Sequence, residues 1–259
     1  VKELSNYKMG EITKSISQGI VTGCNDVYLI SLDFIITHKL ETDYLKKVYK
    51  GKDIRSGELI DSGYYIFYPY EEGEDGKDIC ISEDVLKRKC PNLYSYLKNS
   101  KKILSQRDYF SKSNKKWYEL WNPRRKRHFE NRKFVFSEIN IVNDFVLVDE
   151  CYYTDSACGA ELKDEFKKYE QYLYLYLNSD LITYCYKKLS VPKANGYSIY
   201  KNAFLKELPV LINQQIDDEK MNIDNMQRCE FNDFIYKVFG IDDYEKKLIE
   251  EELCAYKSI

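Results

Sequence analysis

A run of basic and aromatic residues from 112 to 133 restricts the fold of this chain more than any other segment. It holds nine Lys or Arg residues and two Glu residues, a local charge of +7 in a protein of formal net charge -2, so the remainder carries about -9. Both tryptophans, Trp117 and Trp121, lie in this run. One interpretation is a solvated loop that the two tryptophans anchor in the core. The other is a surface for a polyanion, because neutralised phosphates release counterions.

The composition indicates a globular chain with a sizeable core. Of its 259 residues, 44% are hydrophobic and 15% aromatic, whereas 11 Gly and 5 Pro leave little room for linkers. No run approaches eighteen apolar residues and the N-terminus is too polar for a signal peptide, so we expect a soluble, cytoplasmic protein without a membrane partner. The chain starts at Val1, which suggests a segment of something longer. Eight scattered cysteines and two histidines favour reduced thiols and no metal site.

Residue patterns in the first two thirds favour alternating helices and strands. The predicted elements are a short helix or extended arm near residues 12–16, a strand over 27–30, a helix over 40–48, a strand over 64–68, a helix within 86–104 that starts at Pro91, two antiparallel strands over 133–139 and 144–148, a short strand near 151–154, and helices over 161–189 with a capped break at 178–180. Between the first two elements, Gly19 and Gly23 bracket a polar turn that ends at Asn25, where glycine permits positive φ or close approach to a ligand.

The last part of the chain is acidic and helical in pattern. Residues 217–259 carry twelve Asp or Glu and six Lys or Arg, a charge of -6. Apolar residues from Phe231 to Phe239 form one helical face that stops at Gly240, and Asp242 with Glu245 predicts a capping box for a last helix. We expect a helical hairpin that avoids phosphate and packs against protein.

Motifs for catalysis are scarce. The chain lacks Gly-x-Ser-x-Gly, His-Glu-x-x-His and the glycine-rich fingerprints of cofactor and phosphate sites, so we expect no catalytic residues. One enzymatic alternative stays open: Asp149, Glu161 and Lys163 resemble the acidic pair and lysine of metal-dependent nucleases. Residues 161–163, however, favour a helix, whereas that motif requires a strand.

Eight segments match, in order and spacing, a known family. They are residues 19–26 (GIVTGCND), 50–54 (KGKDI), the strand of residues 65–70 ending in Pro-Tyr, 91–97 (PNLYSYL) with Leu104 and Arg107, 117–120 (WYEL), 133–135 (KFV), 177–179 (LNS) and 208–209 (LP). Together they resemble the C-terminal specificity region of TaqI-type adenine-N6 DNA methyltransferases and related type II restriction-modification enzymes.

The resemblance implies a target recognition domain that binds double-stranded DNA. An N-terminal methyltransferase domain of the same polypeptide would bind S-adenosylmethionine and methylate a flipped adenine. That domain would carry a glycine-rich loop and an Asn-Pro-Pro-Tyr or Asn-Pro-Pro-Phe motif, which this sequence lacks. We therefore expect this chain to bind DNA, to hold no cofactor and to do no chemistry alone, and the resemblance leaves open whether the parent also cleaves DNA.

Residue chemistry then selects the candidate DNA contacts. Lys and Arg contact phosphates, whereas Arg reads guanine and Asn or Gln reads adenine. The candidates are Arg124, Arg125, Lys126 and Arg127, flanked by Lys115 and Lys116, with Gln18, Thr22 and Asn25 of the glycine turn as further contacts. We expect Trp117 and Trp121 to belong to the core. We expect Arg107 to be a buried ion-pair partner or a phosphate ligand, and His128 to be a bystander in the basic loop.

The predicted fold is α+β, with a mixed or antiparallel sheet, packed helices and a C-terminal helical hairpin. The predicted division is a DNA recognition domain over residues 1–209 and an acidic helical extension over residues 210–259. Two alternatives to DNA recognition remain at this point, a protein-interaction module that docks subunits and the metal-dependent nuclease.

Overall fold

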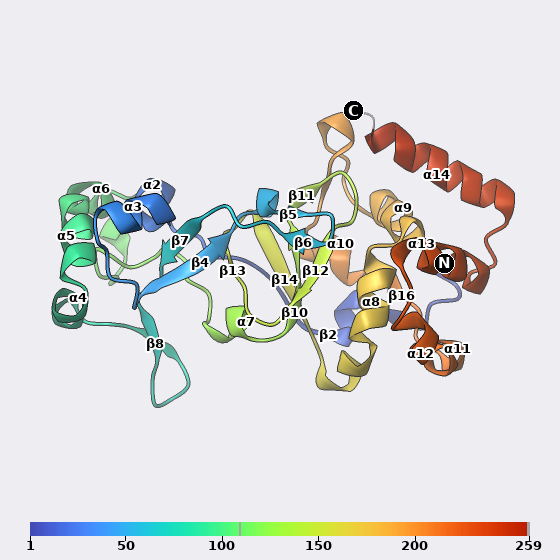
Figure 1. Ribbon diagram of the computed structural model, residues 1–259, viewed down its shortest axis with the longest axis horizontal. Helices are drawn as coiled ribbons and strands as arrows, with labels where there is room; N and C mark the ends of the chain where they lie inside the picture. The colour runs from blue at the N-terminus through green and yellow to red at the C-terminus, as the bar shows by residue number, and fades with distance from the viewer. Residues whose placement is uncertain (109, 258–259) are drawn as a thin grey trace.

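The computed structural model describes residues 1–108 and 110–257 and shows an elongated α+β protein (Figure 1). Two four-stranded sheets lie between groups of helices at the two ends (Figure 1). The central sheet has the order β12-β10-β14-β2, and its neighbouring strands are antiparallel. Its strands are β2 (Thr13–Gln18), β10 (Lys133–Ser137), β12 (Phe145–Val148) and β14 (Ala157–Leu162). The α+β class expected from the sequence is confirmed.

The second sheet is mixed and has the order β13-β4-β7-β3, with β13 parallel to β4 and the other neighbours antiparallel. Its strands are β3 (Leu29–Ser31), β4 (Leu45–Tyr49), β7 (Tyr64–Phe67) and β13 (Tyr152–Tyr153). Short antiparallel ladders complete the strand structure: β1 (Tyr7–Lys8) with β16 (Pro209–Val210), β5 (Ile54–Arg55) with β6 (Glu58–Leu59), β8 (Tyr70–Glu72) with β9 (Asp78–Cys80), and β11 (Ile139–Asn140) with β15 (Ser198–Ile199).

The central sheet separates two hydrophobic cores. Every residue of β10 is buried, as expected for a strand covered on both faces. Successive side chains of a strand point to opposite faces, and Phe134 and Phe136 accordingly enter the first core whereas Val135 enters the second. The two cores therefore share one sheet.

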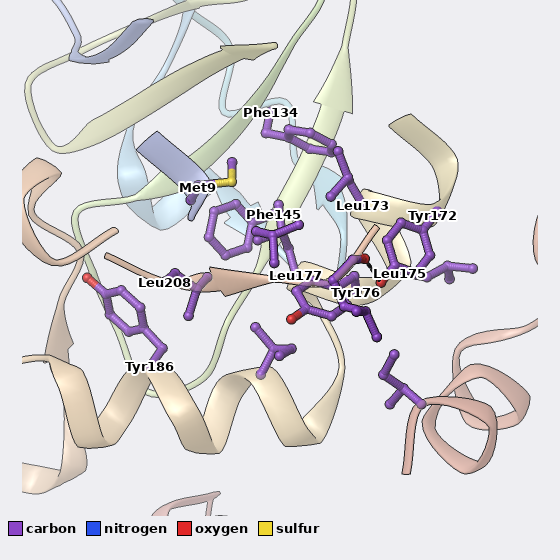
Figure 2. Close-up of a cluster of buried hydrophobic side chains, with 14 of the residues drawn as sticks. Met9, Phe134, Phe145, Tyr172, Leu173, Leu175, Tyr176, Leu177, Tyr186 and Leu208 are labelled. Carbon is purple, nitrogen blue, oxygen red and sulfur yellow. Dashed lines mark hydrogen bonds between the residues drawn. The ribbon is translucent and has the colours of Figure 1, made fainter. Parts of the chain in front are cut away.

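The first core packs helices from both sides of residue 209 against the sheet. These helices are α1 (Met9–Ile12), α8 (Glu170–Leu177), α9 (Asp180–Leu189), α10 (Asn202–Lys206), α11 (Gln214–Asp218), α12 (Lys220–Ile223), α13 (Arg228–Val238) and α14 (Asp243–Lys257). Figure 2 shows Tyr172 and Tyr176 of α8 in this core. Their hydroxyls donate to the carbonyls of Leu211 (2.6 Å) and Pro209 (2.9 Å). The domain boundary at residue 209 stays a prediction.

The second core lies under the N-terminal helices and the mixed sheet. Its helices are α2 (Asn25–Tyr28), α3 (Leu32–Thr37), α4 (Glu83–Lys89), α5 (Pro91–Asn99), α6 (Lys101–Ser105) and α7 (Arg127–Glu130). Short 3-10 helices cover Gly51–Asp53, Phe110–Lys112, Asp164–Tyr169 and Ala194–Gly196.

Several predicted helix ends are confirmed. Pro91 is the first residue of α5, where its missing N–H costs nothing. The Ser179 hydroxyl accepts from the backbone N–H of Ile182 and starts α9 at the predicted break. Asp242 and Glu245 exchange the two hydrogen bonds of a capping box, at 2.8 and 3.1 Å, before α14. The expected helices α13 and α14 are present, and α11 and α12 precede them.

Two predicted elements are wrong, and a third is confirmed only in part. Residues 40–48 form β4 from Leu45 instead of a helix, because pairing with β7 and β13 overrides the helix propensity of Leu and Lys. Residues 27–30 begin inside α2, and the strand starts only at Leu29. Glu161 lies within strand β14, which pairs with β10 and β2 on its two edges, so it is not helical.

Candidate nucleic-acid interface

The glycine turn and the basic run lie against each other, although Gly19 and Arg124 are 105 positions apart in sequence. Val21 and Asn122 exchange backbone hydrogen bonds of 3.0 and 2.9 Å, and the Trp121 N–H donates to the Thr22 carbonyl at 3.1 Å. We call residues 18–25 and 121–128 together the turn–arginine surface. The structure thus brings together most of the candidate contacts that the sequence placed in two separate segments.

Close backbone approach explains Gly19. A Cβ atom there would lie 2.3 Å from the Tyr153 carbonyl oxygen and 2.4 Å from that of Thr154. The Ile20 N–H donates to the Tyr153 carbonyl at 2.9 Å, so the turn is joined to the end of β13. Gly23 has φ +79°, which glycine adopts without strain. These two glycines therefore shape the turn, and contact with a ligand falls to the side chains around them.

The arginine run consists of Arg124, Arg125, Lys126 and Arg127, and these four residues have different surroundings. Arg124 is half-buried, has φ +59° and donates from Nε to the Gly19 carbonyl at 3.2 Å. The backbone N–H of Lys126 donates to the Asp78 carboxylate at 2.5 Å, and the side-chain ammonium of Lys126 pairs with the Glu130 carboxylate at 3.2 Å. Arg125 and Arg127 are exposed, and among the described residues neither side chain forms an ion pair or hydrogen bond. These two guanidinium groups are the most available cations of the run.

The two flanking lysines contact the protein itself. Lys116 donates to the carbonyls of Cys80 (2.7 Å) and Ile81 (2.9 Å), which ties the basic run to the end of β9. Lys115 lies 3.7 Å from the Glu119 carboxylate. Their charges are thus partly compensated, unlike those of Arg125 and Arg127.

The three candidates of the glycine turn also differ. Thr22 is buried, and its hydroxyl donates to Asn25 Oδ1 at 2.6 Å and accepts from the Cys24 N–H at 3.0 Å. Its side chain therefore stabilises the turn and is not available to a ligand. Asn25 is exposed beside it. Gln18 is half-buried at the end of β2 and donates from Nε2 to the Asp155 carbonyl at 2.7 Å.

The two tryptophans divide between core and surface. Trp117 is 7% exposed and packs edge-on against Tyr118, as predicted. Trp121 is 39% exposed, so its assignment to the core is wrong. It directly follows the buried Leu120 and enters the backbone ladder with the glycine turn, which places its ring at the surface. An exposed indole thus lies beside the arginine run.

Buried cations hold the loops around this surface. Arg107 donates to the carbonyls of Leu104 (2.7 Å), Trp117 (3.0 Å) and Glu119 (3.0 Å), which settles its role as a structural residue. Lys133, at the start of β10, donates to the carbonyls of Phe129 (2.7 Å) and Asn131 (2.6 Å) at the end of α7. Burial lowers the pKa of Lys133 to about 8.

A polar groove next to Gln18 contains residues that the sequence did not single out. Its volume is about 500 Å³, and its lining combines Gln18 and Arg124 with Glu138, Lys201 and Asn202. Asn202 opens α10 and donates to the Ile16 carbonyl at 2.6 Å. Residues 138 and 201–202 are isolated polar positions with no motif around them, so only the tertiary structure could place them here.

Comparison with known proteins identifies the family. A model described as the TaqI-like C-terminal specificity domain matches residues 46–210, more than half of the chain. The chain belongs to the family of TaqI-like C-terminal specificity domains. No curated protein matches its sequence. The resemblance expected from eight short segments is thereby confirmed.

Two solved structures share the fold of this TaqI-like specificity domain. The Type IIL restriction-modification enzyme MmeI, determined in complex with DNA, matches 98% of the chain with a TM-score of 0.60 and 10% identity. The type IIG restriction endonuclease BpuSI matches 87% with a TM-score of 0.51 and 11% identity. The chain spans 37% of the MmeI chain and 27% of the BpuSI chain.

The geometry of this TaqI-like specificity domain does not assemble the nuclease trio. Asp149 follows β12 and Glu161 lies near the end of β14, and β10 lies between these two strands. Asp149 pairs with Arg132 at 2.8 Å, whereas Glu161 accepts from Asn131 at 3.0 Å. Within residues 1–108 and 110–257, no group of three His, Cys, Asp or Glu side chains is arranged to hold a metal ion.

The environment of His128 favours its neutral form. Burial, followed by the charge of Arg127, lowers the pKa of His128, so its imidazole is neutral at pH 7. In the described part of the chain, no helix combines the length and apolar character that crossing a bilayer requires.

Proposed function

We propose that this chain recognises a specific sequence in double-stranded DNA as the specificity part of an S-adenosylmethionine-dependent adenine-N6 DNA methyltransferase in a restriction-modification system. Membership of the TaqI-like specificity family and the fold shared with MmeI, solved with DNA, support this proposal. The methyltransferase domain of the same polypeptide is the partner that would bind S-adenosylmethionine and the flipped adenine.

The turn–arginine surface is the observation that carries the proposal. It presents the guanidinium groups of Arg125 and Arg127, which have no counterion among the described residues, next to the exposed ring of Trp121. Phosphate contacts by Arg fix the register of a protein on the duplex, and neighbouring side chains then reach base edges. The surface offers both kinds of group, with Asn25 and Gln18 as the base-contacting candidates.

The distribution of charge favours one orientation on DNA. The arginine run leads into α7 in the middle of the molecule, whereas the acidic C-terminal segment, with α13 and α14, lies at one end (Figure 1). A polyanion is attracted to the first region and repelled by the second. The duplex would thus contact the middle of the protein and leave the C-terminal helices for contacts with protein.

Fluorescence anisotropy with labelled duplex DNA over a salt series tests this proposal. The wild-type chain should bind with an affinity that falls as salt rises, because bound phosphates release counterions. The double variant Arg125→Ala/Arg127→Ala should bind more weakly, and the slope of log affinity against log salt should shrink by about 2.

Lys247→Ala in α14 is the matched control, since it removes an exposed cation from the acidic end of the molecule and should leave the salt slope unchanged. Absence of binding at low salt, or binding without a salt slope, would contradict the proposal. Capture of a partner protein by a chain that does not bind DNA would instead favour the subunit-docking alternative.

A further inference from the structure

The polar groove beside β2 has a composition that does not suit phosphate. Its charged groups are the half-buried cation Arg124, the half-buried anion Glu138 and, at the exposed edge, Lys201, and the amides of Gln18 and Asn202 line it as well. A carboxylate inside a half-buried groove repels a phosphate, because desolvated like charges are costly. Base edges, by contrast, carry donors and acceptors side by side and no net charge. The groove therefore matches the edge of a base pair.

Arg124 is held in a conformation that leaves its terminal nitrogens available. Its Nε donates to the Gly19 carbonyl at 3.2 Å, and its own carbonyl accepts from the Tyr68 hydroxyl at 3.1 Å. The residue has φ +59°, a left-handed conformation that costs free energy in residues other than glycine. Among the residues that the structure describes, neither terminal nitrogen of Arg124 forms a hydrogen bond. The guanidinium is thus fixed at one edge and presents two donors at the other.

The two amides are fixed in a similar way. Gln18 donates from Nε2 to the Asp155 carbonyl at 2.7 Å, and Asn202 donates from Nδ2 to the Ile16 carbonyl at 2.6 Å. Because a carbonyl can only accept, each amide nitrogen must face the backbone, and each amide oxygen is turned away from it. These anchors reduce the side-chain entropy lost when a ligand binds.

Glu138 and Arg124 act on the same point of the groove. Burial and, to a smaller extent, the Glu138 carboxylate raise the pKa of the Cys158 thiol to about 12, and the charge of Arg124 opposes this increase. Both side chains line the same groove as Cys158. Within the described residues no ion pair joins the Arg124 guanidinium and the Glu138 carboxylate, so these two groups lie more than 4.0 Å apart. Each group keeps hydrogen-bonding atoms that are available to a ligand.

We propose that this groove reads one G·C base pair from the major groove of the duplex. Arg124 donates its two terminal N–H groups to guanine O6 and N7, and Glu138 accepts from the N4 amino group of the paired cytosine. Gln18 and Asn202 border the pair and read its neighbours. The inference rests on the proposed function and adds the residues that determine one position of the recognised sequence.

Selection of binding sites from duplexes with a randomised core, followed by sequencing, tests the inference. The wild-type chain should enrich a motif that contains a strongly preferred G·C pair. Arg124→Lys keeps the positive charge but loses the two terminal N–H donors of the guanidinium, and Glu138→Gln loses the carboxylate. Either change should reduce the preference at that one position by about 5- to 150-fold and leave the other positions of the motif unchanged. Arg125→Ala should weaken binding to all sequences equally.

Each outcome discriminates between the two proposals. A motif that persists in full in Arg124→Lys and Glu138→Gln would overturn the groove inference and leave DNA recognition standing. Binding of the wild-type chain without any enriched motif would overturn the inference together with the sequence specificity of the proposed function, and no binding to any duplex would overturn DNA recognition itself. Arg124→Gly, which suits φ +59°, provides a second variant whose fold is verified by thermal unfolding.

Discussion

At the scale of single residues, the partners of each cation separate structural from ligand-binding roles. Arg107 and Lys133 are buried and donate to backbone carbonyls, so they connect loops. Arg125 and Arg127 are exposed and have no such bonds within the described residues. Sequence alone could not make this distinction, because all four residues occur in or near the same basic run.

The different exposure of the two tryptophans predicts different quenching. In Trp117→Phe the remaining fluorescence comes from Trp121, which is 39% exposed, and in Trp121→Phe it comes from Trp117, which is 7% exposed. Acrylamide should quench the first variant more strongly, and duplex DNA should protect only that variant if Trp121 borders the interface. Equal quenching of the two variants would contradict the exposure of Trp121.

Backbone space at Gly19 gives a second prediction. Gly19→Ala places a Cβ atom 2.3 Å from the Tyr153 carbonyl oxygen, so the turn or the end of β13 must shift. We expect urea unfolding to show a loss of about 1–3 kcal/mol, the usual cost of overpacking. Ala203→Ser, at an exposed position, is a control that should stay within about 0.5 kcal/mol. Wild-type stability in Gly19→Ala would show that the turn does not approach β13 so closely.

At the scale of elements, the start of β10 and the end of α7 depend on the buried ammonium of Lys133. Its pKa, about 8, lies below the usual 10.5 of lysine because burial disfavours the charged form. Between these values the unfolded chain binds more protons at this residue than the folded chain does. The contribution of Lys133 to the free energy of unfolding therefore rises as pH increases from 8 to 10.5.

Urea unfolding of the wild type and Lys133→Met at a series of pH values measures this contribution. Other groups titrate in both proteins, so the difference in free energy of unfolding, wild type minus variant, isolates Lys133. We expect this difference to increase between pH 8 and 10.5. A difference that stays constant over this range would show that Lys133 has an ordinary pKa.

Predictability from sequence also varied among elements. Strands β7, β10 and β12 were predicted because β-branched and aromatic residues concentrate there, and α5 and α9 because Pro91 and Ser179 mark their starts. Strand β14 reads Ala-Cys-Gly-Ala-Glu-Leu and has no such signal. Its small residues allow close packing, as at Gly159, where a Cβ would lie 2.0 Å from the Tyr153 hydroxyl. The joining of the glycine turn to residues 121–124 is a long-range pairing that no local pattern contains.

At the scale of the whole molecule, the shared central sheet should make the two cores unfold together. Phe231 of α13 is fully buried in the first core, whereas Trp117 belongs to the second. Phe231→Ala should cost about 3–5 kcal/mol and lower the urea midpoint seen by tryptophan fluorescence as well as by circular dichroism. An unchanged fluorescence midpoint would instead show that residues 210–259 unfold as a separate unit, in line with a domain boundary at residue 209.

Hydrogen exchange with and without a bound duplex tests the central claim most directly, since it locates the interface on the wild-type chain. We predict that amides of residues 18–25 and of residues 121–128 gain protection together on addition of DNA, because these two segments form one surface. Amides of α13 and α14 should exchange at the same rate in both samples. Protection confined to the C-terminal helices, or absent from either half of the turn–arginine surface, would contradict this account.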